Sequence, residues 1–472
     1  MLERELAAIL GPKGWVPGAE SAGSSHDWLN RYGELPLGVA RPASTAEVAA
    51  VVAACHAAGV PVVPQGGNTG LCGAAVPGIP GGVIVNLMRM GGIEPPDLAG
   101  GSVTVGAGLV LARLHQALEG TGLMFPMHLG AEGSAQIGGL IGTNAGGSQA
   151  FRYGMMQDLV LGLEVVLPDG TIWNGLRAVQ KDNAGYQLRK LFCGAEGTLG
   201  VVTRAVLRLH PAPRQRLTAL VALPSLAAAV TFGTGLSAEA GEFLQAMEFF
   251  SETGLDLALR HVAGLDWPLD SRAKAYLLLE LGSGSPRVAL DEIATALLEQ
   301  GMEQGLILDG ALAASGAQRA AFWRLREEQP EGQRREGPQL KHDISVPPAR
   351  IAEFVDRGEA LCNATLPGVR INPFGHLGDG NIHYNLTPPE GRADFAGQDA
   401  ALANALAALA TDMGGSFAAE HGLGRSKTAL ADALRPPAER ALHRRIKAAL
   451  DPAGQMNPGV IVQPIDKNNL SI

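Results

Sequence analysis

The sequence lacks several features that would assign it to other classes of protein. No segment reaches about 18 uninterrupted apolar residues, so no transmembrane helix is expected. The N-terminal segment MLERELAAIL carries Glu3 and Glu5, and it is typical of a short amphipathic helix rather than a signal peptide. The net charge is −9 and no basic stripe stands out, which argues against nucleic acid as a partner.

Aromatic residues and cysteines are also scarce. Aromatics make up 5% of the 472 residues, and the four cysteines are not spaced as a metal or redox pair. The absence of such pairs favours a reduced, cytoplasmic compartment. Glycine, in contrast, is abundant with 63 residues, and 46% of the chain is apolar. We therefore expect a globular protein of two to four domains that is rich in tight turns and close backbone contacts.

Periodic patterns divide the chain into three parts. Residues 196–213 predict a strand pair that ends at prolines, and we place the end of a first domain, 1–213, there. Residues 214–414 alternate apolar strands with Ala-rich helices, which predicts a second domain built on an antiparallel sheet with helices on one face. Residues 415–472 are a C-terminal segment that carries further helical patterns.

Two glycine-rich loops predict an anion site. The first is PQGGNTG at 64–70, which follows a short apolar strand, and the second is IGGLIGTNAGG at 137–147. Glycines let backbone N–H groups approach an anion without an intervening side chain. Two such loops suit a pyrophosphate held from two sides, although either loop alone fits an ordinary tight turn equally well.

Gly106 and Gly108 are a weaker indication of a nucleotide-binding site. Gly106 and Gly108 follow a predicted strand and precede a predicted helix, as in a nucleotide-binding βαβ unit. That fingerprint requires a third Gly or Ala three residues after the second glycine, and this chain has Leu111 there. We therefore do not expect a nicotinamide site.

The segment PFGHLGDGNIHYN carries the sharpest local signal. An apolar strand delivers His376, GDGN predicts a turn, and His383 and Asn385 then share one face of a second strand. Such a hairpin can bring two imidazoles to one site, and imidazole suits zinc, manganese or iron-class metals. The alternative is a buried turn whose histidines bond to the backbone.

The segment SFAAEHGLG offers a candidate third metal ligand and a candidate base. Glu420 is a candidate third ligand, because two histidines and one glutamate with an open position form a common catalytic arrangement. The adjoining His421 is a candidate base.

Six motifs, taken in order, give the chain a specific resemblance. They are PQGGNTGLCGAAVP, LGAEGSAQIGGLIGTNAGG with RYG at 152–154, LGLEVVLPDG, KDNAGY with LFCGAEGTLGVVT, FGHLGDGNIHYN and AEHGLG. From about Trp28 to Val462, the chain resembles the FAD-linked D-2-hydroxy-acid dehydrogenases of the vanillyl-alcohol-oxidase type. The resemblance implies an α+β fold: a two-subdomain, PCMH-type FAD-binding domain, a substrate domain whose antiparallel sheet is covered by helices, and a C-terminal segment that packs back on the FAD domain.

The resemblance also implies FAD as the cofactor. Some relatives tether the flavin through a histidine in the first glycine loop, and 65–70 contains none, so we expect non-covalent FAD. The implied cofactor-binding residues are Pro64, Gln65, Gly66, Gly67, Asn68, Thr69, Gly70, Gly130, Ala131, Gly133, Ser134, Gly138, Gly139, Gly142, Thr143, Asn144, Gly146, Gly147, Gly197, Gly200, Val201, Val202 and Asn457.

A metal and a substrate site follow from the same resemblance. It implies a divalent metal, zinc or manganese, and His421 as the base. The implied metal ligands are His376, His383 and Glu420, and the implied substrate-binding residues are Arg326, Lys341 and Asn385.

The substrate that the resemblance implies is a D-2-hydroxy acid. The loop PQGGNTG, and Asn385 after His383, are similar to the branch of the family that oxidises D-2-hydroxyglutarate to 2-oxoglutarate. Pro330, one turn after Arg326, departs from that branch, which carries a threonine there near the distal carboxylate. Because proline has no hydroxyl to donate, D-malate or another short D-2-hydroxy acid stays an alternative.

Three other functions also stay open at this point. They are a D-lactate or glycolate dehydrogenase, an electron-transferring flavin subunit without a substrate site of its own, and a hydrolase that uses the histidines and Glu420 with a metal. The resemblance implies an electron acceptor such as an electron-transfer flavoprotein or a quinone, and a homodimer.

Overall fold

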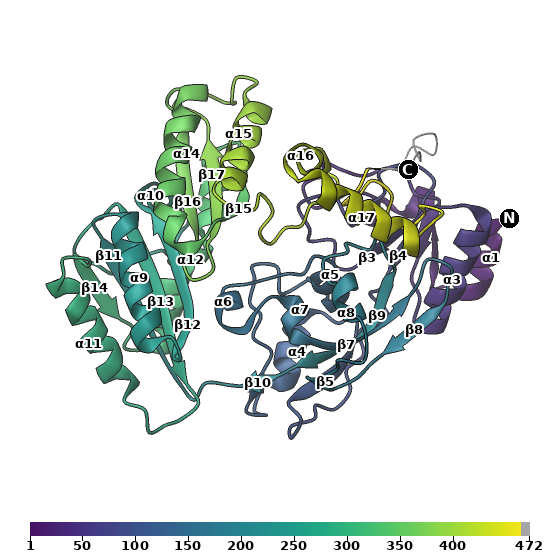
Figure 1. Cartoon of the computed structure of the whole chain (residues 1–472), viewed down its shortest axis with the longest axis horizontal. Coiled ribbons are helices and arrows are strands. Elements are labelled where there is room, and N and C mark those ends of the chain that lie inside the picture. Colours follow the sequence, from purple (N-terminus) through teal and green to yellow (C-terminus); the bar gives the residue numbers. More distant parts are fainter. Residues whose placement is uncertain (464–472) are drawn as a thin grey trace. The chain divides into compact units, whose positions relative to one another are not determined.

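The computed structural model describes residues 1–463, and the chain divides into two compact units (Figure 1). Unit 1 comprises Met1–Gly147, Tyr153–Pro211 and the chain from Glu420 onward, and unit 2 comprises Ser148–Arg152 and Ala212–Ala419. The sequence places the boundaries after residues 213 and 414, whereas the chain changes unit after Pro211 and after Ala419.

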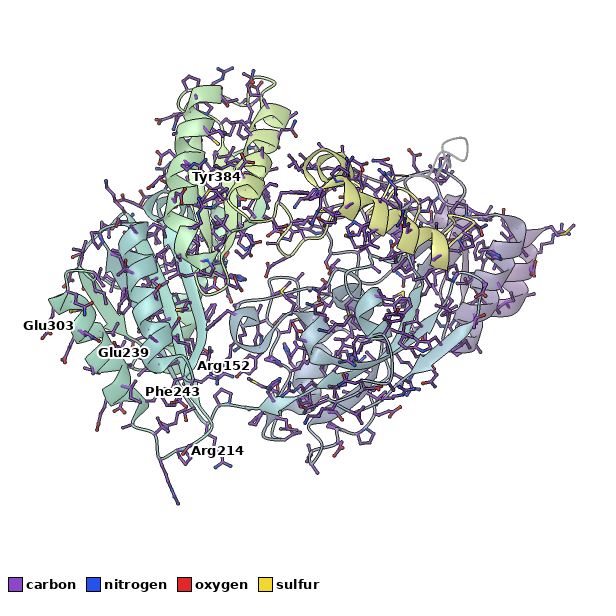
Figure 2. The ribbon with its side chains drawn as sticks, viewed as in Figure 1. Arg152, Arg214, Glu239, Phe243, Glu303 and Tyr384 are labelled. Atoms are coloured by element: carbon purple, nitrogen blue, oxygen red, sulfur yellow. The ribbon has the colours of Figure 1, made fainter. Side chains whose placement is uncertain are left out.

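The short segment Ser148–Arg152 differs most from the predicted domain limits. It falls within the predicted first domain but belongs to unit 2. The reason is that Arg152, labelled in Figure 2, donates hydrogen bonds from Nη1 to the carbonyl oxygens of Gly241 (3.3 Å) and Leu244 (2.9 Å).

The described residues of unit 1 form two four-stranded sheets and a two-stranded pair. The first sheet has the order β1 (Trp15–Pro17), β2 (Gly38–Ala40), β4 (Val83–Asn86), β3 (Val62–Gln65). In this sheet β2, β4 and β3 run parallel, and β1 pairs antiparallel to β2. The second sheet has the order β5 (Ser102–Gly106), β9 (Val201–Arg208), β7 (Val160–Val166), β8 (Ile172–Gly175), and all its pairs are antiparallel. The separate pair joins β10 (His210–Pro211) to β6 (Leu123–Met124).

Several helices of unit 1 contribute buried apolar residues to the core that packs against these sheets. The helices of this unit are α1 (Leu2–Leu10), α2 (Ala22–Ser25), α3 (Thr45–Ala58), α4 (Leu111–Leu118), α5 (Ile137–Gly142), α7 (Met156–Leu159), α8 (Leu188–Phe192), α16 (Thr428–Leu434) and α17 (Pro437–Leu450); α6 (Ala150–Tyr153) spans the change of unit. The predicted capping signal at α3 is confirmed, because the Ser44 hydroxyl accepts a hydrogen bond from Glu47 N. Buried Val48, Val51 and Val52 then face the unit 1 core.

One strand prediction in unit 1 is wrong. Residues 196–213 contain β9 and the two-residue strand β10, but these strands do not pair with each other: β9 lies between β5 and β7, and β10 pairs with β6. No Gly, Pro or Asn interrupts Val201–Arg208, so no turn folds this strand back on itself.

Unit 2 is built on one seven-stranded sheet in which every neighbouring pair is antiparallel. The strand order is β14 (Asp309–Leu312), β11 (Gln215–Leu223), β13 (Ala275–Ser283), β12 (Leu244–Ser251), β16 (Arg370–His376), β17 (Asn381–Thr387), β15 (Asp343–Ser345). The helices are α9 (Leu226–Ala240), α10 (Glu252–His261), α11 (Leu290–Glu303), α12 (Gly316–Glu327), α13 (Gln329–Glu336), α14 (Ile351–Thr365) and α15 (Asp399–Asp412).

Helices cover both faces of this sheet, which corrects the prediction of helices on one face. In β13, Leu277 and Leu279 join one apolar cluster with residues of α9, α11, α14 and α15. The alternate residues Tyr276 and Leu278 join a second cluster with residues of α10 and α12. Because neighbouring residues of a strand point to opposite faces, the two clusters lie on opposite sides of the sheet.

Among residues 1–463, no helix is both long and apolar enough to cross a membrane.

Candidate functional site

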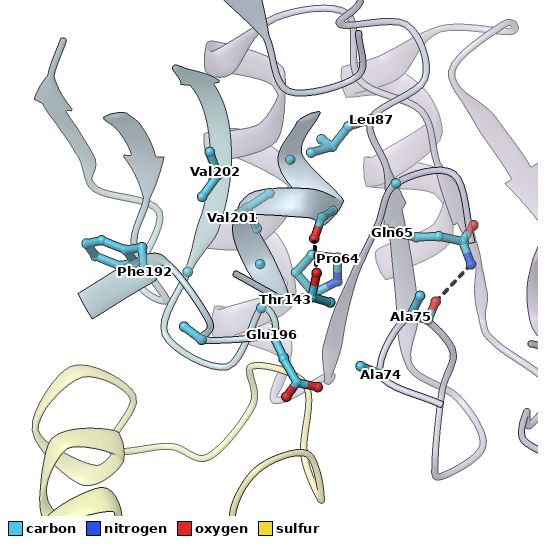
Figure 3. A pocket seen from close by; sticks show the side chains of 17 residues that line it. Pro64, Gln65, Ala74, Ala75, Leu87, Thr143, Phe192, Glu196, Val201 and Val202 are labelled. Carbon is cyan, nitrogen blue, oxygen red and sulfur yellow. Dashed lines mark hydrogen bonds between the residues drawn. The ribbon is translucent and has the colours of Figure 1, made fainter. Parts of the chain in front are cut away.

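A cleft in unit 1 is formed where the two glycine loops meet (Figure 3). About 630 Å³ of space, part of it open to solvent, lies in this cleft. Its lining residues are Pro64, Gln65, Gly66, Ala74, Ala75, Leu87, Gly138, Gly139, Gly142, Thr143, Phe192, Ala195, Glu196, Gly197, Gly200, Val201 and Val202. The wall is largely backbone and small apolar side chains, which suits a planar organic group beside an anion.

The glycines of the cleft allow neighbouring segments to pack closely, and they leave the cleft open to a ligand. A Cβ atom at Gly138 would lie 2.8 Å from Ala107 Cβ, and one at Gly197, which has φ +71°, would lie 2.9 Å from Pro64 Cγ. A Cβ at Gly66 would lie 3.5 Å from Gly139 N, so the two loops are immediate neighbours. Side chains at these positions would separate the loops or fill the cleft.

Eleven of the residues predicted to bind the cofactor line this cleft: Pro64, Gln65, Gly66, Gly138, Gly139, Gly142, Thr143, Gly197, Gly200, Val201 and Val202. The other twelve do not line it: Gly67, Asn68, Thr69, Gly70, Gly130, Ala131, Gly133, Ser134, Asn144, Gly146, Gly147 and Asn457. Some of these support the wall. A Cβ at Gly67 would collide with the carbonyl of Ser134, and Asn457 Nδ2 donates to the carbonyl oxygens of Ala74 (2.8 Å) and Glu196 (2.7 Å).

The residue that sequence reasoning missed most clearly is Glu196. Burial raises the pKa of its carboxyl to about 7, although it accepts hydrogen bonds from Leu423 N (2.9 Å) and Gly424 N (2.8 Å). Figure 3 shows this carboxylate directed at the C-terminal segment. The signal was available in the motif GAEGTLG, where an acidic residue stands among residues predicted to bind the cofactor.

The same contacts place the predicted metal ligand Glu420 and the predicted base His421 in unit 1. Two residues after His421, the backbone is held by Glu196. A Cβ at Gly146, in the second glycine loop, would lie 2.9 Å from Glu420 Oε1. Within unit 1, the EHGLG segment (420–424) therefore lies against both the second glycine loop and the cleft residue Glu196.

In unit 2, the strand register places the predicted histidines on one face of the sheet. Phe374 of β16 is opposite His383 of β17, and His376 is opposite Glu248 of β12. Opposite residues of antiparallel strands point to the same face, and so do alternate residues along one strand. The two imidazole centroids are 5.8 Å apart and the rings are nearly perpendicular, at 87°.

Carboxylates surround these two imidazoles. His376 Nδ1 lies 3.5 Å from Asp379 Oδ2, and His383 Nδ1 lies 3.9 Å from Asp343 Oδ1. Metal-binding histidines usually direct one ring nitrogen to a carboxylate and use the other as the ligand. Both imidazoles thus lie near carboxylates on one face of the unit 2 sheet.

Arg326 joins the same face from α12. Its side chain is 10% exposed, its Nε lies 2.7 Å from Glu248 Oε2, and its guanidinium lies 4.7 Å from the centre of the Phe374 ring. The other oxygen of Glu248 lies 3.7 Å from His376 Nε2. The predicted substrate arginine and metal ligand thus share one buried carboxylate, which sequence reasoning missed because β12 is more than 70 residues from either partner in the chain.

The two remaining substrate candidates lie on the neighbouring strands. Asn385 is buried, and its Nδ2 donates to Gln333 Oε1 of α13 (2.8 Å). Lys341 is exposed and directly follows Leu340, which pairs with Leu386, so the antiparallel register puts Lys341 opposite Asn385. Unit 2 therefore brings His376, His383, Arg326 and Asn385 to one face, with Lys341 at its edge.

Two family models match the chain. "FAD binding domain" matches residues 36–175, and "FAD linked oxidases, C-terminal domain" matches residues 212–461. The second match covers Ala212–Ala419 of unit 2 and most of the chain that follows it.

Curated relatives match nearly the whole chain. The chain is 37% identical to a D-2-hydroxyglutarate dehydrogenase of Xanthomonas citri pv. viticola over 93% of this chain and 92% of that protein. It is 35% identical to a D-2-hydroxyglutarate dehydrogenase of Stutzerimonas stutzeri, over 97% and 98%. It is 36% identical to the mitochondrial D-2-hydroxyglutarate dehydrogenase of Bos taurus, over 92% and 78%.

Solved structures show the same fold. A p-cresol methylhydroxylase with substrate bound superposes with a TM-score of 0.77 at 16% identity, over 98% of this chain and 96% of that one. A 4-ethylphenol oxidase from Gulosibacter chungangensis gives 0.77 at 18% identity, over 99% and 97%. The α+β fold class expected from the sequence is thereby confirmed.

Proposed function

This chain belongs to the family of FAD-linked D-2-hydroxy-acid dehydrogenases, and we propose that it oxidises D-2-hydroxyglutarate to 2-oxoglutarate with the help of a divalent metal ion. The observation that carries this proposal is the face of unit 2 on which two imidazoles, Arg326 and Asn385 gather. Family membership argues against a metal-dependent hydrolase. The charged face argues against a flavin subunit that has no substrate site of its own.

For FAD, we propose non-covalent binding in the cleft of unit 1. The neighbouring glycine loops offer backbone N–H groups to the pyrophosphate, and the apolar wall suits the flavin ring. Within the first loop, 65–70, no side chain is a histidine that could form the covalent tether.

For the metal, zinc or manganese, we propose His376, His383 and Glu420 as ligands. The carboxylates beside both Nδ1 atoms support this choice.

The mechanism assigns each side chain a role. When bound, FAD supplies the hydride acceptor and a divalent cation favours the ionised form of the substrate hydroxyl. His421 takes the proton of that hydroxyl, a role worth roughly 10²–10⁴ in rate. Arg326 forms paired hydrogen bonds with a substrate carboxylate, and Lys341 adds a second positive charge. Oxidation removes the hydroxyl proton and the hydride on C2, which leaves 2-oxoglutarate and reduced flavin.

D-Malate is a second candidate substrate, and Pro330 is the observation that favours it. Pro330 lies in the first turn of α13, one turn after Arg326, and has no hydroxyl for a distal carboxylate. We expect Pro330→Thr to raise kcat/KM for D-2-hydroxyglutarate relative to D-malate about fivefold, since one added hydrogen bond contributes about 1 kcal/mol. An unchanged ratio would show that the distal carboxylate lies elsewhere.

The proposal is tested by a steady-state substrate panel on metal-replete, yellow protein with a dye as electron acceptor. D-2-hydroxyglutarate should give the highest kcat/KM among D-2-hydroxyglutarate, D-malate, D-lactate and glycolate. A preference for D-lactate or glycolate would refute the proposed substrate but keep the reaction class. We further propose that the natural electron acceptor is an electron-transfer flavoprotein or a quinone. We also propose that the protein is a homodimer and that it is cytoplasmic.

A further inference from the structure

Unit 1 carries a second group of metal-ligand side chains that does not line the cleft. His115 lies on α4, His128 follows β6, and Glu132 lies in the turn after it. We propose that these three side chains bind a divalent transition-metal ion of the zinc class. The role of this ion is structural: it fastens the segment 128–134 to α4, beside the glycine loops.

The distances between the ligand atoms fit one ion. Glu132 Oε2 lies 3.2 Å from His128 Nδ1 and 3.8 Å from His115 Nδ1. All three side chains offer a ligand atom within 4.8 Å of the others, and the two ring centroids are 4.7 Å apart. Tetrahedral zinc, with ligand bonds of about 2.1 Å, holds its ligand atoms about 3.4 Å apart. Small side-chain rotations therefore suffice for the ion to be bound.

The backbone holds the three side chains in place before any ion binds. Ala112 N of α4 donates to Glu132 O (3.0 Å), and Leu111 N donates to Ala135 O (2.9 Å). Glu132 N donates to Leu129 O (3.1 Å), which closes the turn between His128 and Glu132. Metal binding thus requires little ordering of the chain, which lowers its entropic cost.

The exposed fractions of the three side chains favour a metal site over a stabilising ion pair. The side chains of His115, His128 and Glu132 are 21%, 47% and 41% exposed. At such exposure a histidine–glutamate pair contributes only about 0–1 kcal/mol, so the pair by itself adds little to the fold. The same exposure lets an ion enter and leaves a coordination position for water, as in a three-ligand zinc site.

An ion at this site would act on the FAD cleft through the backbone. The carbonyl of His128 is packed against Gly147 of the second glycine loop, where a Cβ would collide with it. The carbonyl of Ser134 is packed in the same way against Gly67 of the first loop. Fixing the segment 128–134 should therefore hold both loops in place and slow the release of flavin.

The test compares purified holoenzyme with the double variant His115→Gln/His128→Gln at about pH 7.5, where unperturbed imidazoles are mostly neutral. Zinc alone is the probe, and bound zinc is counted after dialysis against a weak chelator. We expect the wild type to hold one zinc equivalent more than the double variant. We also expect added zinc to slow flavin release several-fold in the wild type but not in the variant.

Two further variants make the result decisive. His56→Gln, an exposed histidine on α3, should behave as the wild type. Glu132→Gln alters only an exposed side chain and should lose the same zinc equivalent even if the double variant folds poorly. Equal zinc content in the wild type, Glu132→Gln and the double variant would overturn the inference. The outcome does not depend on the proposed catalytic metal, because its ligands are unchanged in every variant.

Discussion

The two units build their sites from different parts of the chain. The cleft of unit 1 is lined mainly by glycine backbone and small apolar side chains from loops that are continuous motifs. The charged face of unit 2 is built from side chains of β12, β16, β17 and α12, which meet only through strand register and helix packing. A backbone site is sensitive to any added atom, whereas a side-chain site is sensitive to the removal of a single charge.

The largest effect should come from the proposed base. We expect His421→Ala to lower turnover by roughly 10²–10⁴ while flavin stays bound, because the side chain acts on a proton and does not line the cleft. Steady-state kinetics and the flavin spectrum measure the two quantities separately. His443→Ala on α17 is the matched control. Unchanged turnover in His421→Ala would remove this residue from the mechanism.

The buried carboxylate Glu248 tests the side-chain site. Glu248→Gln should destabilise unit 2 by about 3–5 kcal/mol and weaken substrate binding, because it leaves the buried charge of Arg326 without its partner. Flavin affinity, which we assign to the cleft of unit 1, should change little. Urea unfolding and flavin titration measure these effects, with the exposed Glu303→Gln as control. If flavin affinity fell as much as stability, the contrast between the units would be wrong.

The buried carboxyl of Glu196 should make the free energy of unfolding depend on pH. Its pKa rises from 4.5 to about 7 on folding, so its stabilising contribution is complete below pH 4.5 and is lost as the pH rises through about 7. The loss amounts to about 3 kcal/mol at most. Glu196→Gln should therefore flatten the fall in stability between these pH values, as measured by urea unfolding. A variant with the pH profile of the wild type would exclude Glu196 as the titrating group.

The smallest expected effects come from substitutions at two adjacent glycines of α5. A Cβ at Gly138 would lie 2.8 Å from Ala107 Cβ, whereas nothing lies within 4 Å of one at Gly139. Gly138→Ala should cost about 1–3 kcal/mol of stability. Gly139→Ala should leave stability nearly unchanged and weaken flavin binding, because its methyl group enters the cleft. Equal flavin affinity in Gly139→Ala and the wild type would argue that flavin does not bind against this wall.

The contrast between the units also explains what the sequence could predict. The glycine loops and the hairpin with His376 and His383 are local motifs, and the structure places the loops side by side and the histidines on one face. Glu248 could not be predicted, because its proximity to Arg326 depends on the pairing of β12 with β16. No periodic pattern encodes a contact of this kind between distant strands and helices.

The prediction of helices on one face had a recognisable cause. The strands LTALVAL and AYLLLEL are almost continuously apolar instead of alternating. Continuous apolar strands are typical of a sheet covered on both faces, so the correct signal was present. Glu280, the single carboxylate of the second strand, is buried and is satisfied by Arg319 and Trp323 of α12. An internal charge pair thus accounts for the one residue that interrupts the apolar pattern.

Anaerobic reduction of the bound flavin by D-2-hydroxyglutarate, measured before and after a chelator removes the metal, tests the proposed substrate and the proposed metal together. We expect the substrate to bleach the oxidised flavin in metal-replete protein. We also expect chelation to abolish this reduction while the protein stays yellow, and added zinc or manganese to restore it. Rapid reduction in chelated protein would contradict a catalytic metal, and no reduction in metal-replete protein would contradict the proposed substrate.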